Sequence, residues 1–373
     1  MQSVARGWLA LQITNSPFMV GFVSAAGTLP VLLLTLYAGV VADRHDKLRV
    51  VRATQSLLLI EAALLWWFLW SGHMTIVWLV LISLLGGTFN AFDIPARQAL
   101  MIELVGREDL VDAIALNSSG FNLARIIGPS IAAVIIAKFG LAWCFALNAL
   151  SYLLVLLSLF RIHLADWVRN ADVGSPMEGL LEGLRFMIRT REVTLLVSLV
   201  AVYSIFGIPY LVLMPVIARD TLNSGAGGYG LLLAAVGFGA VVGAVSLAMA
   251  GRSLRRGRLL SFATFTFCVC LVAFSLSRSL WLSALILVFV GLTMILNNAL
   301  ANTLLQTIAP DELRGRVMSA YAFVFVGMGP IGALLSGGVA DLVGAPAAIA
   351  IGAAVLMLFA AWVFGKRTEL RAL

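Results

Sequence analysis

Charged residues are scarce in this sequence. Only 12% of its 373 residues are Asp, Glu, Lys or Arg, whereas 61% are hydrophobic, and the mean hydropathy is +1.03. A soluble chain carries about 25% charged residues. A water-soluble fold of this length could not hide so much apolar surface. The composition therefore excludes a soluble protein and indicates that lipid surrounds the chain.

Cysteine and histidine are equally rare. The three cysteines lie inside apolar runs without metal or disulfide spacing, and the three histidines are scattered in or near loops. The sequence has no Gly-Lys-Ser/Thr phosphate loop, which excludes ATP hydrolysis within this chain. We expect no metal, no cofactor and no enzyme activity. The net charge of +7 does not indicate a nucleic-acid partner, because the basic residues sit in short loops rather than on one face.

Long apolar runs dominate what is present. They are continuous over about twenty residues, which predicts transmembrane helices and not barrel strands, since barrel strands alternate apolar and polar residues. The expected spans are residues 18–41, 50–70, 76–94, 114–137, 142–160, 193–217, 229–250, 259–276, 281–308, 317–339 and 347–364.

A shorter apolar run precedes the first full span. Residues 3–14 would form a helix about 18 Å long, too short for a hydrocarbon core of about 30 Å. We expect the truncated half of a first helix, so that the sequence holds eleven full spans plus a half span and the authentic chain starts upstream of Met1.

The basic residues cluster in alternate loops, which orients the chain by the positive-inside rule. The loop 41–52, the segment 161–192 and the C-terminus are expected in the cytoplasm.

The chain divides into similar halves around a polar linker. We expect six-helix bundles at 1–164, whose first helix is incomplete, and at 193–373. The cytoplasmic linker 165–192 should hold an amphipathic helix that starts at Ser175-Pro176. That helix is expected to lie on the cytoplasmic membrane surface, where it either has a regulatory role or only connects the two halves.

Matched short motifs support the two halves. Asn15-Ser16 is echoed by Asn223-Ser224, and Lys138-Phe139-Gly140 by Leu342-Val343-Gly344. A parallel repeat of this kind is typical of transporters whose substrate binds between the halves. The predicted fold is thus an all-α integral membrane protein with two bundles related by a pseudo-two-fold axis.

Several motifs resemble those of a known family. Gly39, Asp43, Arg44, Lys47 and Arg49 are spaced like the loop 2–3 signature of the major facilitator superfamily, with Asp46 at the position of its usual second glycine. Residues 124–129, Ala-Arg-Ile-Ile-Gly-Pro, resemble the helix 5 motif associated with exporters. Further matches lie at 93–98, 117–125, 215–220 and 310–316. Together they resemble the enterobactin- and macrolide-exporter branch, of the transmembrane secretion effector type.

The resemblance implies a twelve-helix, monomeric transporter in the inner membrane of a bacterium. It implies efflux of a small amphipathic organic molecule, siderophore-like or drug-like, by alternating access with the proton gradient as the driving force. An importer of the same fold and an inactive truncated fragment remain alternatives. A membrane enzyme is disfavoured because histidines and acids do not cluster near one interface.

The same resemblance assigns a gate. In the family, the aspartate at the position of Asp43 meets the start of helix 11 in the state closed to the cytoplasm, where an anion suits a helix N-terminus. Arg97 is expected near the same end of its helix and could orient Asp43. Arg44, Lys47 and Arg49 either share this role or are ordinary positive-inside residues.

Polar residues inside the spans are candidates for substrate contact or coupling, because charge near the bilayer centre is costly. Arg6, Glu61 and Arg125 lie near mid-span; Arg125 could meet a carboxylate, and Glu61 could be a structural partner, a silent neutral acid or a proton carrier. Asp93 and Arg97 are spaced for a local ion pair. The other candidates are Asn117, Asn122 and the stripe Asn298, Asn302 and Gln306, which could bind substrate or neighbouring helices.

Two Gly-Pro pairs are expected to bend their helices. They are Gly128-Pro129 and Gly329-Pro330, both in the middle of predicted spans.

Overall fold

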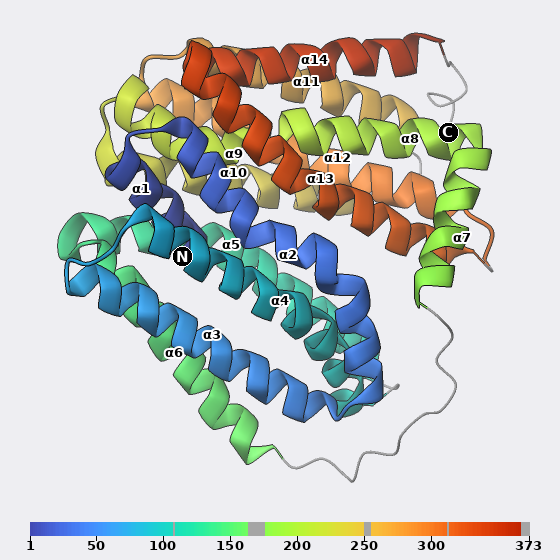
Figure 1. The fold of residues 1–373 in the computed structure, drawn as a ribbon. Coiled ribbons are helices and arrows are strands. Elements are labelled where there is room, and N and C mark those ends of the chain that lie inside the picture. Colours follow the sequence, from blue (N-terminus) through green and yellow to red (C-terminus); the bar gives the residue numbers. More distant parts are fainter. Residues whose placement is uncertain (107–108, 163–175, 250–254, 312, 367–373) are drawn as a thin grey trace. The chain divides into compact units, whose positions relative to one another are not determined.

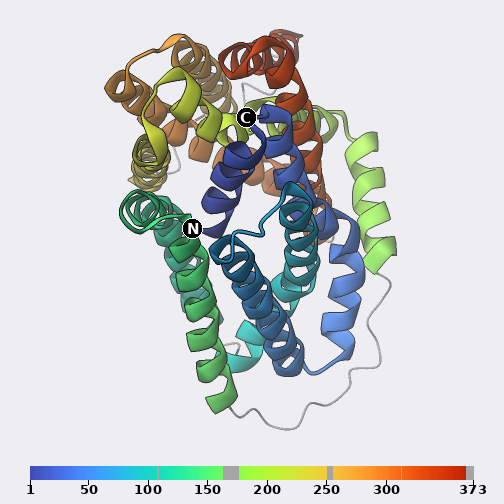
Figure 2. The ribbon, with the colours of Figure 1, turned by 60° about the vertical axis from the view of Figure 1, so that its left-hand side comes forward.

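The computed structural model describes residues 1–106, 109–162, 176–249, 255–311 and 313–366 (Figure 1). Every regular element among these residues is a helix, which confirms the all-α prediction (Figure 2). The helices are α1 Gln2–Thr14, α2 Pro17–Arg44, α3 Lys47–Trp70, α4 Ile76–Val105, α5 Leu110–Phe139, α6 Leu141–Arg161, α7 Pro176–Arg189, α8 Arg191–Val202, η1 Tyr203–Gly207, α9 Tyr210–Val216, η2 Ile217–Thr221, α10 Gly225–Met249, α11 Arg256–Leu276, α12 Leu280–Ile308, α13 Arg314–Val343 and α14 Ala345–Lys366.

Ten segments within the described ranges are long and apolar enough to cross a membrane. One of them, Arg191–Thr221, joins α8, η1, α9 and η2. Trp66, Trp67 and Trp70 at the end of α3 and Trp78 near the start of α4 are 37–67% exposed. Tryptophans gather at the boundary between the bilayer and water, so this end of the α3–α4 pair fits that boundary.

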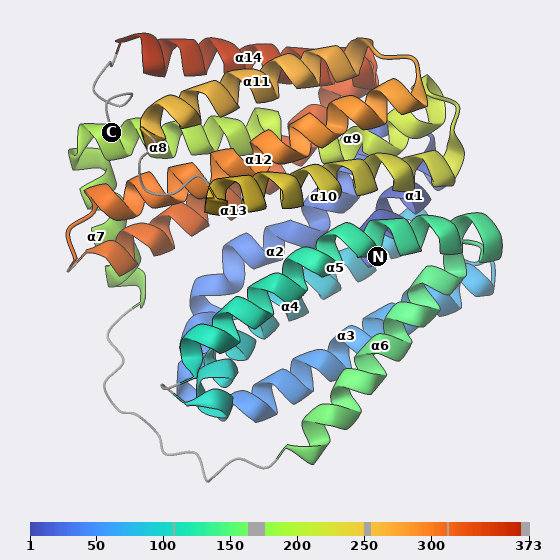
Figure 3. The same cartoon turned by 180° about the vertical axis from the view of Figure 1, so that it is seen from behind.

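The chain forms two compact units. The first comprises Met1–Asn15 and Phe22–Glu178, and the second comprises Ser16–Gly21 and Gly179–Leu373. In the first unit, α3 packs between α4 and α6, and α1 contacts α4, α5 and α6 (Figure 3). In the second unit, α12 packs against α10 and α11, and α14 against α11 and α13.

The segment Ser16–Gly21 belongs to the second unit because it contacts α13. The Ser16 hydroxyl donates a 2.9 Å hydrogen bond to Asp341. A Cβ added at Gly21 would lie 2.3 Å from the carbonyl oxygen of Ala333, so the two backbones touch at this glycine. Small residues permit such close helix contacts inside membranes.

Matched positions of the predicted repeat share their backbone conformation. Asn15 and Asn223 have φ angles of 53° and 49°, and Gly140 and Gly344 have φ angles of 91° and 85°. Asparagine and glycine are the residues that adopt positive φ most readily, and both end helices in this way. The motif pairs therefore mark equivalent turns in the two halves.

The span predicted at 193–217 is not one continuous α-helix. It contains two π-helical turns, η1 and η2, in which the Ile208 N–H donates to the Tyr203 carbonyl at 3.0 Å and the Leu222 N–H to the Ile217 carbonyl at 2.9 Å. Pro209 and Pro215 lack the N–H that a regular helix needs, so the hydrogen-bond pattern shifts around them. By contrast, α5 and α13 continue through Gly128-Pro129 and Gly329-Pro330 without a break.

The linker helix α7 begins at Pro176, as the first-turn proline predicts; Ser175 lies outside the described residues. Its Gly183 fits so closely against α13 that a Cβ there would lie 2.3 Å from the Arg316 carbonyl oxygen. Glu182 forms an ion pair with Arg316 beside this contact. The helix is therefore docked on the first turn of α13 (Figure 1).

Candidate functional sites

The loop between α2 and α3 explains why aspartate replaces the usual glycine of the motif. Asp46 caps α3, because its Oδ1 accepts hydrogen bonds from the backbone N–H groups of Leu48 at 2.9 Å and Arg49 at 3.2 Å. A capping carboxylate satisfies backbone donors that a helix start leaves unpaired. Asp46 thus fixes where α3 begins.

The basic residues of this motif have local partners. Lys47 forms an ion pair with Glu103 on α4. Arg49 forms an ion pair with Asp46, in which Nε lies 3.1 Å from Oδ2. Arg44 is exposed at the end of α2, and a Cβ at Gly39 would meet no atom within 4 Å. These contacts give Lys47 and Arg49 partners within the first unit, and a gating role for the two residues stays a prediction. The Asp43 side chain lies outside the described side chains, so its gating role stays a prediction.

Asp93 is the centre of a buried cluster between α3 and α4. Asp93 is 1% exposed. Its Oδ1 accepts hydrogen bonds from the side chains of Thr54 and Gln55, both at 2.8 Å. Its Oδ2 lies 3.3 Å from Nη2 of Arg97. The local pair of Asp93 and Arg97 predicted from their spacing is present. Because each carboxylate oxygen has a donor, Asp93 is held in place, while the Arg97 side chain is 61% exposed.

Arg6 and Glu61 meet inside the first unit. They form an ion pair between α1 and α3, and their side chains are 16% and 1% exposed. Gln2 donates to the second carboxylate oxygen of Glu61 at 2.6 Å, and Asn148 on α6 donates to Gln2. A buried charge is tolerated when it is paired and hydrogen-bonded, and this network supplies both conditions.

The network is open at one atom. Within the described residues, Arg6 Nε is buried without a hydrogen-bond partner. Gly86 on α4 makes room for the pair, because a Cβ there would lie 3.0 Å from both Arg6 Nη2 and Glu61 Oε1. Arg6 therefore keeps one donor available, and a small residue holds the space beside it.

The remaining first-unit candidates lie on α5. Asn117 is exposed, whereas the side chains of Asn122 and Arg125 lie outside the described side chains. The expectation of an ion pair or substrate contact for Arg125 stays a prediction.

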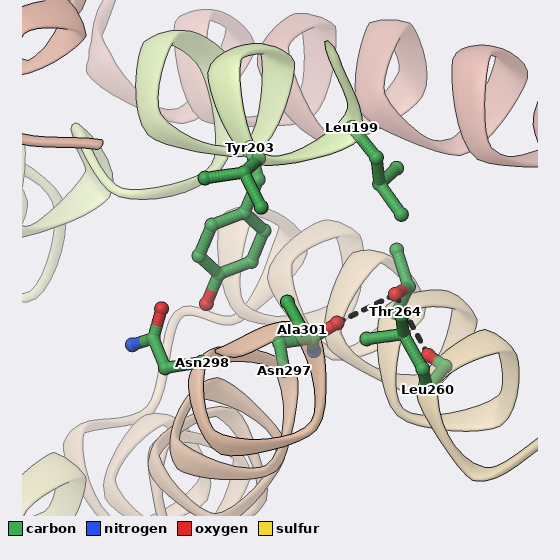
Figure 4. Close-up of a pocket in the computed structure, with 8 residues that line it drawn as sticks. Leu199, Tyr203, Leu260, Thr264, Asn297, Asn298 and Ala301 are labelled. Atoms are coloured by element: carbon green, nitrogen blue, oxygen red, sulfur yellow. Dashed lines mark hydrogen bonds between the residues drawn. The ribbon is translucent and has the colours of Figure 1, made fainter. Parts of the chain in front are cut away.

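The polar residues of α12 separate into three situations. Asn297 is 5% exposed and accepts a 2.5 Å hydrogen bond from Thr264 on α11, so it connects helices. Gln306 donates to Asn302 at 2.5 Å within α12 itself. Asn298 is half-buried and lines a pocket with Tyr203, Thr264 and Asn297 (Figure 4).

Sequence reasoning missed the partners that complete these sites. Gln2 and Asn148 are single polar residues in apolar helices, and only the tertiary contacts link them to Glu61. Tyr203 was hidden in an apolar run, although the nearby Pro209 is a signal of irregular helix. Arg52 lies in the basic loop 41–52, and its guanidinium donates to the carbonyl oxygens of Leu159 and Ile162, both at 2.9 Å, at the end of α6.

Comparisons with known proteins place the chain. The sequence model of the family described as transmembrane secretion effector matches residues 1–373. The multidrug efflux pump Tap of Mycolicibacterium fortuitum is 28% identical, over 98% of this chain and 91% of the pump. The staphyloferrin A transporter of Staphylococcus aureus is 24% identical, over 91% of this chain and 85% of that transporter. The enterobactin exporter EntS of Shigella flexneri is 28% identical, over 87% of this chain and 77% of that exporter.

Solved structures share the fold at low sequence identity. The inward-facing, unoccupied structure of a bacterial homolog of the human lysosomal transporter Spinster has a TM-score of 0.72 at 14% identity, covering 99% of this chain and 94% of that one. The nucleoside transporter NupG has a TM-score of 0.74 at 10% identity, and the match covers 97% of this chain and 93% of NupG. The predicted major facilitator fold and the prediction of a transporter rather than an enzyme are confirmed. The chain is a multi-pass membrane protein and belongs to the transmembrane secretion effector family of major facilitator transporters.

Proposed function

We propose that this chain exports a small amphipathic organic molecule, siderophore-like or drug-like, in exchange for protons by alternating access. Export is supported by relatives named as an efflux pump and as a siderophore exporter. The observation that supports coupling is the buried pair of Arg6 and Glu61, a titratable carboxylate enclosed between α1 and α3.

A proton carrier in an antiporter must change the protein when it gains its proton. Ionised Glu61 holds Arg6 and therefore ties α1 to α3. Protonated Glu61 keeps hydrogen-bonding capacity but loses the ion pair. Because a bias of about 1.4 kcal/mol changes a two-state ratio tenfold, breaking one buried pair is enough to shift the balance between inward-open and outward-open states.

Asp93 is less suited to this role. Its two oxygens already have three donors, one of them the exposed Arg97, so its site is completed from within the protein. Glu61 instead shares its network with an arginine that retains a free buried donor, Nε. We assign coupling to Glu61 and a structural role to Asp93.

The same proposal gives Asp43 the gating role expected from the motif, favouring the state closed to the cytoplasm. A carboxylate at a helix N-terminus is worth about 0.3–2 kcal/mol, enough to bias two states. The transporter acts as a monomer in the inner membrane of a bacterium, with the C-terminus in the cytoplasm, and needs only lipid, substrate and the proton gradient.

The proposal is tested in proteoliposomes with an acidic lumen. Enterobactin, erythromycin and ethidium are offered outside, and an antiporter should accumulate at least one of them as protons leave. Glu61→Gln should abolish this accumulation but retain exchange of the same compound across the membrane without a pH gradient, because the amide cannot carry the proton yet still hydrogen-bonds. Glu103→Gln, a matched change at a carboxylate 33% exposed, should retain both activities.

Three outcomes contradict parts of the proposal. Accumulation only when the outside is acidic would indicate a symporter and thus import. Wild-type behaviour of Glu61→Gln would remove the coupling role from this pair. Failure of wild-type protein to move any of the three compounds would contradict the proposed substrate class.

A further inference from the structure

A tyrosine hydroxyl lies unused inside the second unit. Tyr203 is 4% exposed, and within the described part of the chain its hydroxyl has no hydrogen-bond partner. A buried polar group without a partner costs about 1–3 kcal/mol, and native proteins rarely leave one in place. The hydroxyl therefore needs an explanation beyond packing.

The local backbone holds this tyrosine in a fixed position. Tyr203 begins η1, and Ser204 beside it donates a 2.7 Å hydrogen bond to the Phe325 carbonyl of α13. The Tyr203 ring packs on Phe267 of α11 with centroids 4.9 Å apart. Single π-helical turns inside longer helices are frequent at functional sites. The ring cannot easily turn its hydroxyl toward another partner.

The opposite wall of the pocket is α12. Asn297 is already hydrogen-bonded there, because its Oδ1 accepts from Thr264 at 2.5 Å and its Nδ2 donates to the Thr293 carbonyl at 2.8 Å. The next residue, Asn298, also lines the pocket, and in Figure 4 its amide group lies on the side of the Tyr203 hydroxyl, with the amide oxygen nearer to that hydroxyl than the nitrogen. Two neutral hydrogen-bonding groups thus converge on one space without bonding each other in any described contact.

The rest of the pocket is apolar. Leu199, Leu260 and Ala301 contribute to its lining, and no charged residue does so within the described residues. An ionised group would lose its hydration here without gaining a counter-ion, which is strongly unfavourable. An uncharged oxygen, in contrast, could accept a hydrogen bond from the Tyr203 hydroxyl and another from the Asn298 amide.

We propose that Tyr203 and Asn298 form a subsite for an uncharged hydroxyl or carbonyl group of the transported molecule. The inference rests on the proposed function and narrows its substrate class to molecules with a neutral oxygen-bearing end. It accounts for the unpartnered hydroxyl, for the π-helical turn that fixes it and for the absence of charge in the described lining.

The test measures equilibrium binding of enterobactin, erythromycin and ethidium to the purified full chain in nanodiscs. The first two carry hydroxyl and carbonyl groups, whereas ethidium has neither. Tyr203→Phe keeps the ring and should weaken binding of enterobactin or erythromycin about tenfold, the loss expected for one buried hydrogen bond, while ethidium binding changes less than about twofold. Asn298→Ala should act in the same direction.

A matched control lies on the same transmembrane segment. Tyr210 is 2% exposed, and its hydroxyl contacts Met294 Sδ at 3.8 Å. Tyr210→Phe therefore removes a buried hydroxyl that lies outside this pocket. The affinity of this variant for each probe should stay within about twofold of the wild-type affinity. Tyr203→Phe should also unfold at the same or a higher temperature than wild type, because it removes an unpartnered buried group. Loss of affinity together with retained stability distinguishes recognition from a structural role.

Each remaining outcome decides the inference. Unchanged affinity of Tyr203→Phe for both oxygen-bearing probes would show that the hydroxyl serves only a water molecule, and would overturn the subsite alone. The subsite would also be overturned if the wild-type protein bound ethidium but neither enterobactin nor erythromycin. If wild type binds none of the three probes, the proposed function fails and the subsite fails with it.

Discussion

At the scale of single residues, Gly86 controls the space beside the buried ion pair. The two nearest charged atoms, Arg6 Nη2 and Glu61 Oε1, would each lie 3.0 Å from a Cβ at this position. The Glu61 side chain is 1% exposed and bonded to both Arg6 and Gln2, so moving either atom disturbs this buried network. A larger residue must therefore displace part of the pair.

Gly86→Val is expected to destabilise the protein by about 1–3 kcal/mol, the usual cost of overpacking a filled interior. Thermal unfolding of the purified protein in detergent measures the change as a lower midpoint. Gly120→Val is the control, since Gly120 is exposed on α5 and a Cβ there meets nothing within 4 Å. Equal unfolding midpoints for the two variants would contradict the packing described around Arg6 and Glu61.

At the scale of elements, the docked linker helix depends on one close contact. α7 crosses the start of α13 at Gly183, and the ion pair of Glu182 with Arg316 is half-exposed, so it contributes little by itself. The close backbone approach is thus the main reason that α7 stays on α13.

Gly183→Val should separate α7 from α13, because the added side chain would overlap the Arg316 carbonyl. Hydrogen exchange of the backbone amides of residues 181–189 should become faster, as expected when a helix loses its tertiary support. Gly315→Val changes the neighbouring helix at a position where a Cβ meets nothing within 4 Å and should leave exchange unchanged. Slow exchange in both variants would mean that the glycine contact does not hold α7.

At the scale of the whole molecule, orientation is the property that loop charge predicts. Arg255 and Ser279 flank α11, whose 21 residues extend about 32 Å, enough for one crossing. Alternate loops are basic, and Arg255 belongs to a basic one. The two residues are therefore expected on opposite sides of the membrane.

In a background with Cys144, Cys268 and Cys270 replaced by alanine, Ser279→Cys should react with a membrane-impermeant maleimide added to intact cells. Arg255→Cys should react only after the membrane is permeabilised. Both positions are exposed, so accessibility within the protein is not limiting. The reverse labelling pattern would place the C-terminus outside and overturn the charge-based orientation.

The sequence by itself determined the broad features of this protein. Apolar runs of about twenty residues require helices, because a lipid interior leaves no partner for unpaired backbone groups. Repeated short motifs paired Asn15 with Asn223 and Gly140 with Gly344, and the structure gives both members of each pair a positive φ angle. The motif around Gly39 and Asp43 led to the family. These are local properties, and local sequence carries them.

Only the tertiary structure decided which polar residues act together. Arg6 and Glu61 are 55 positions apart, and no spacing rule predicts that they pair or that Gln2 and Asn148 complete their network. Asn297 and Asn298 are adjacent in sequence, yet helix rotation turns one toward Thr264 and the other toward Tyr203. Partnership inside a membrane depends on how helices pack and rotate against one another, and a one-dimensional pattern of polar residues leaves that arrangement open.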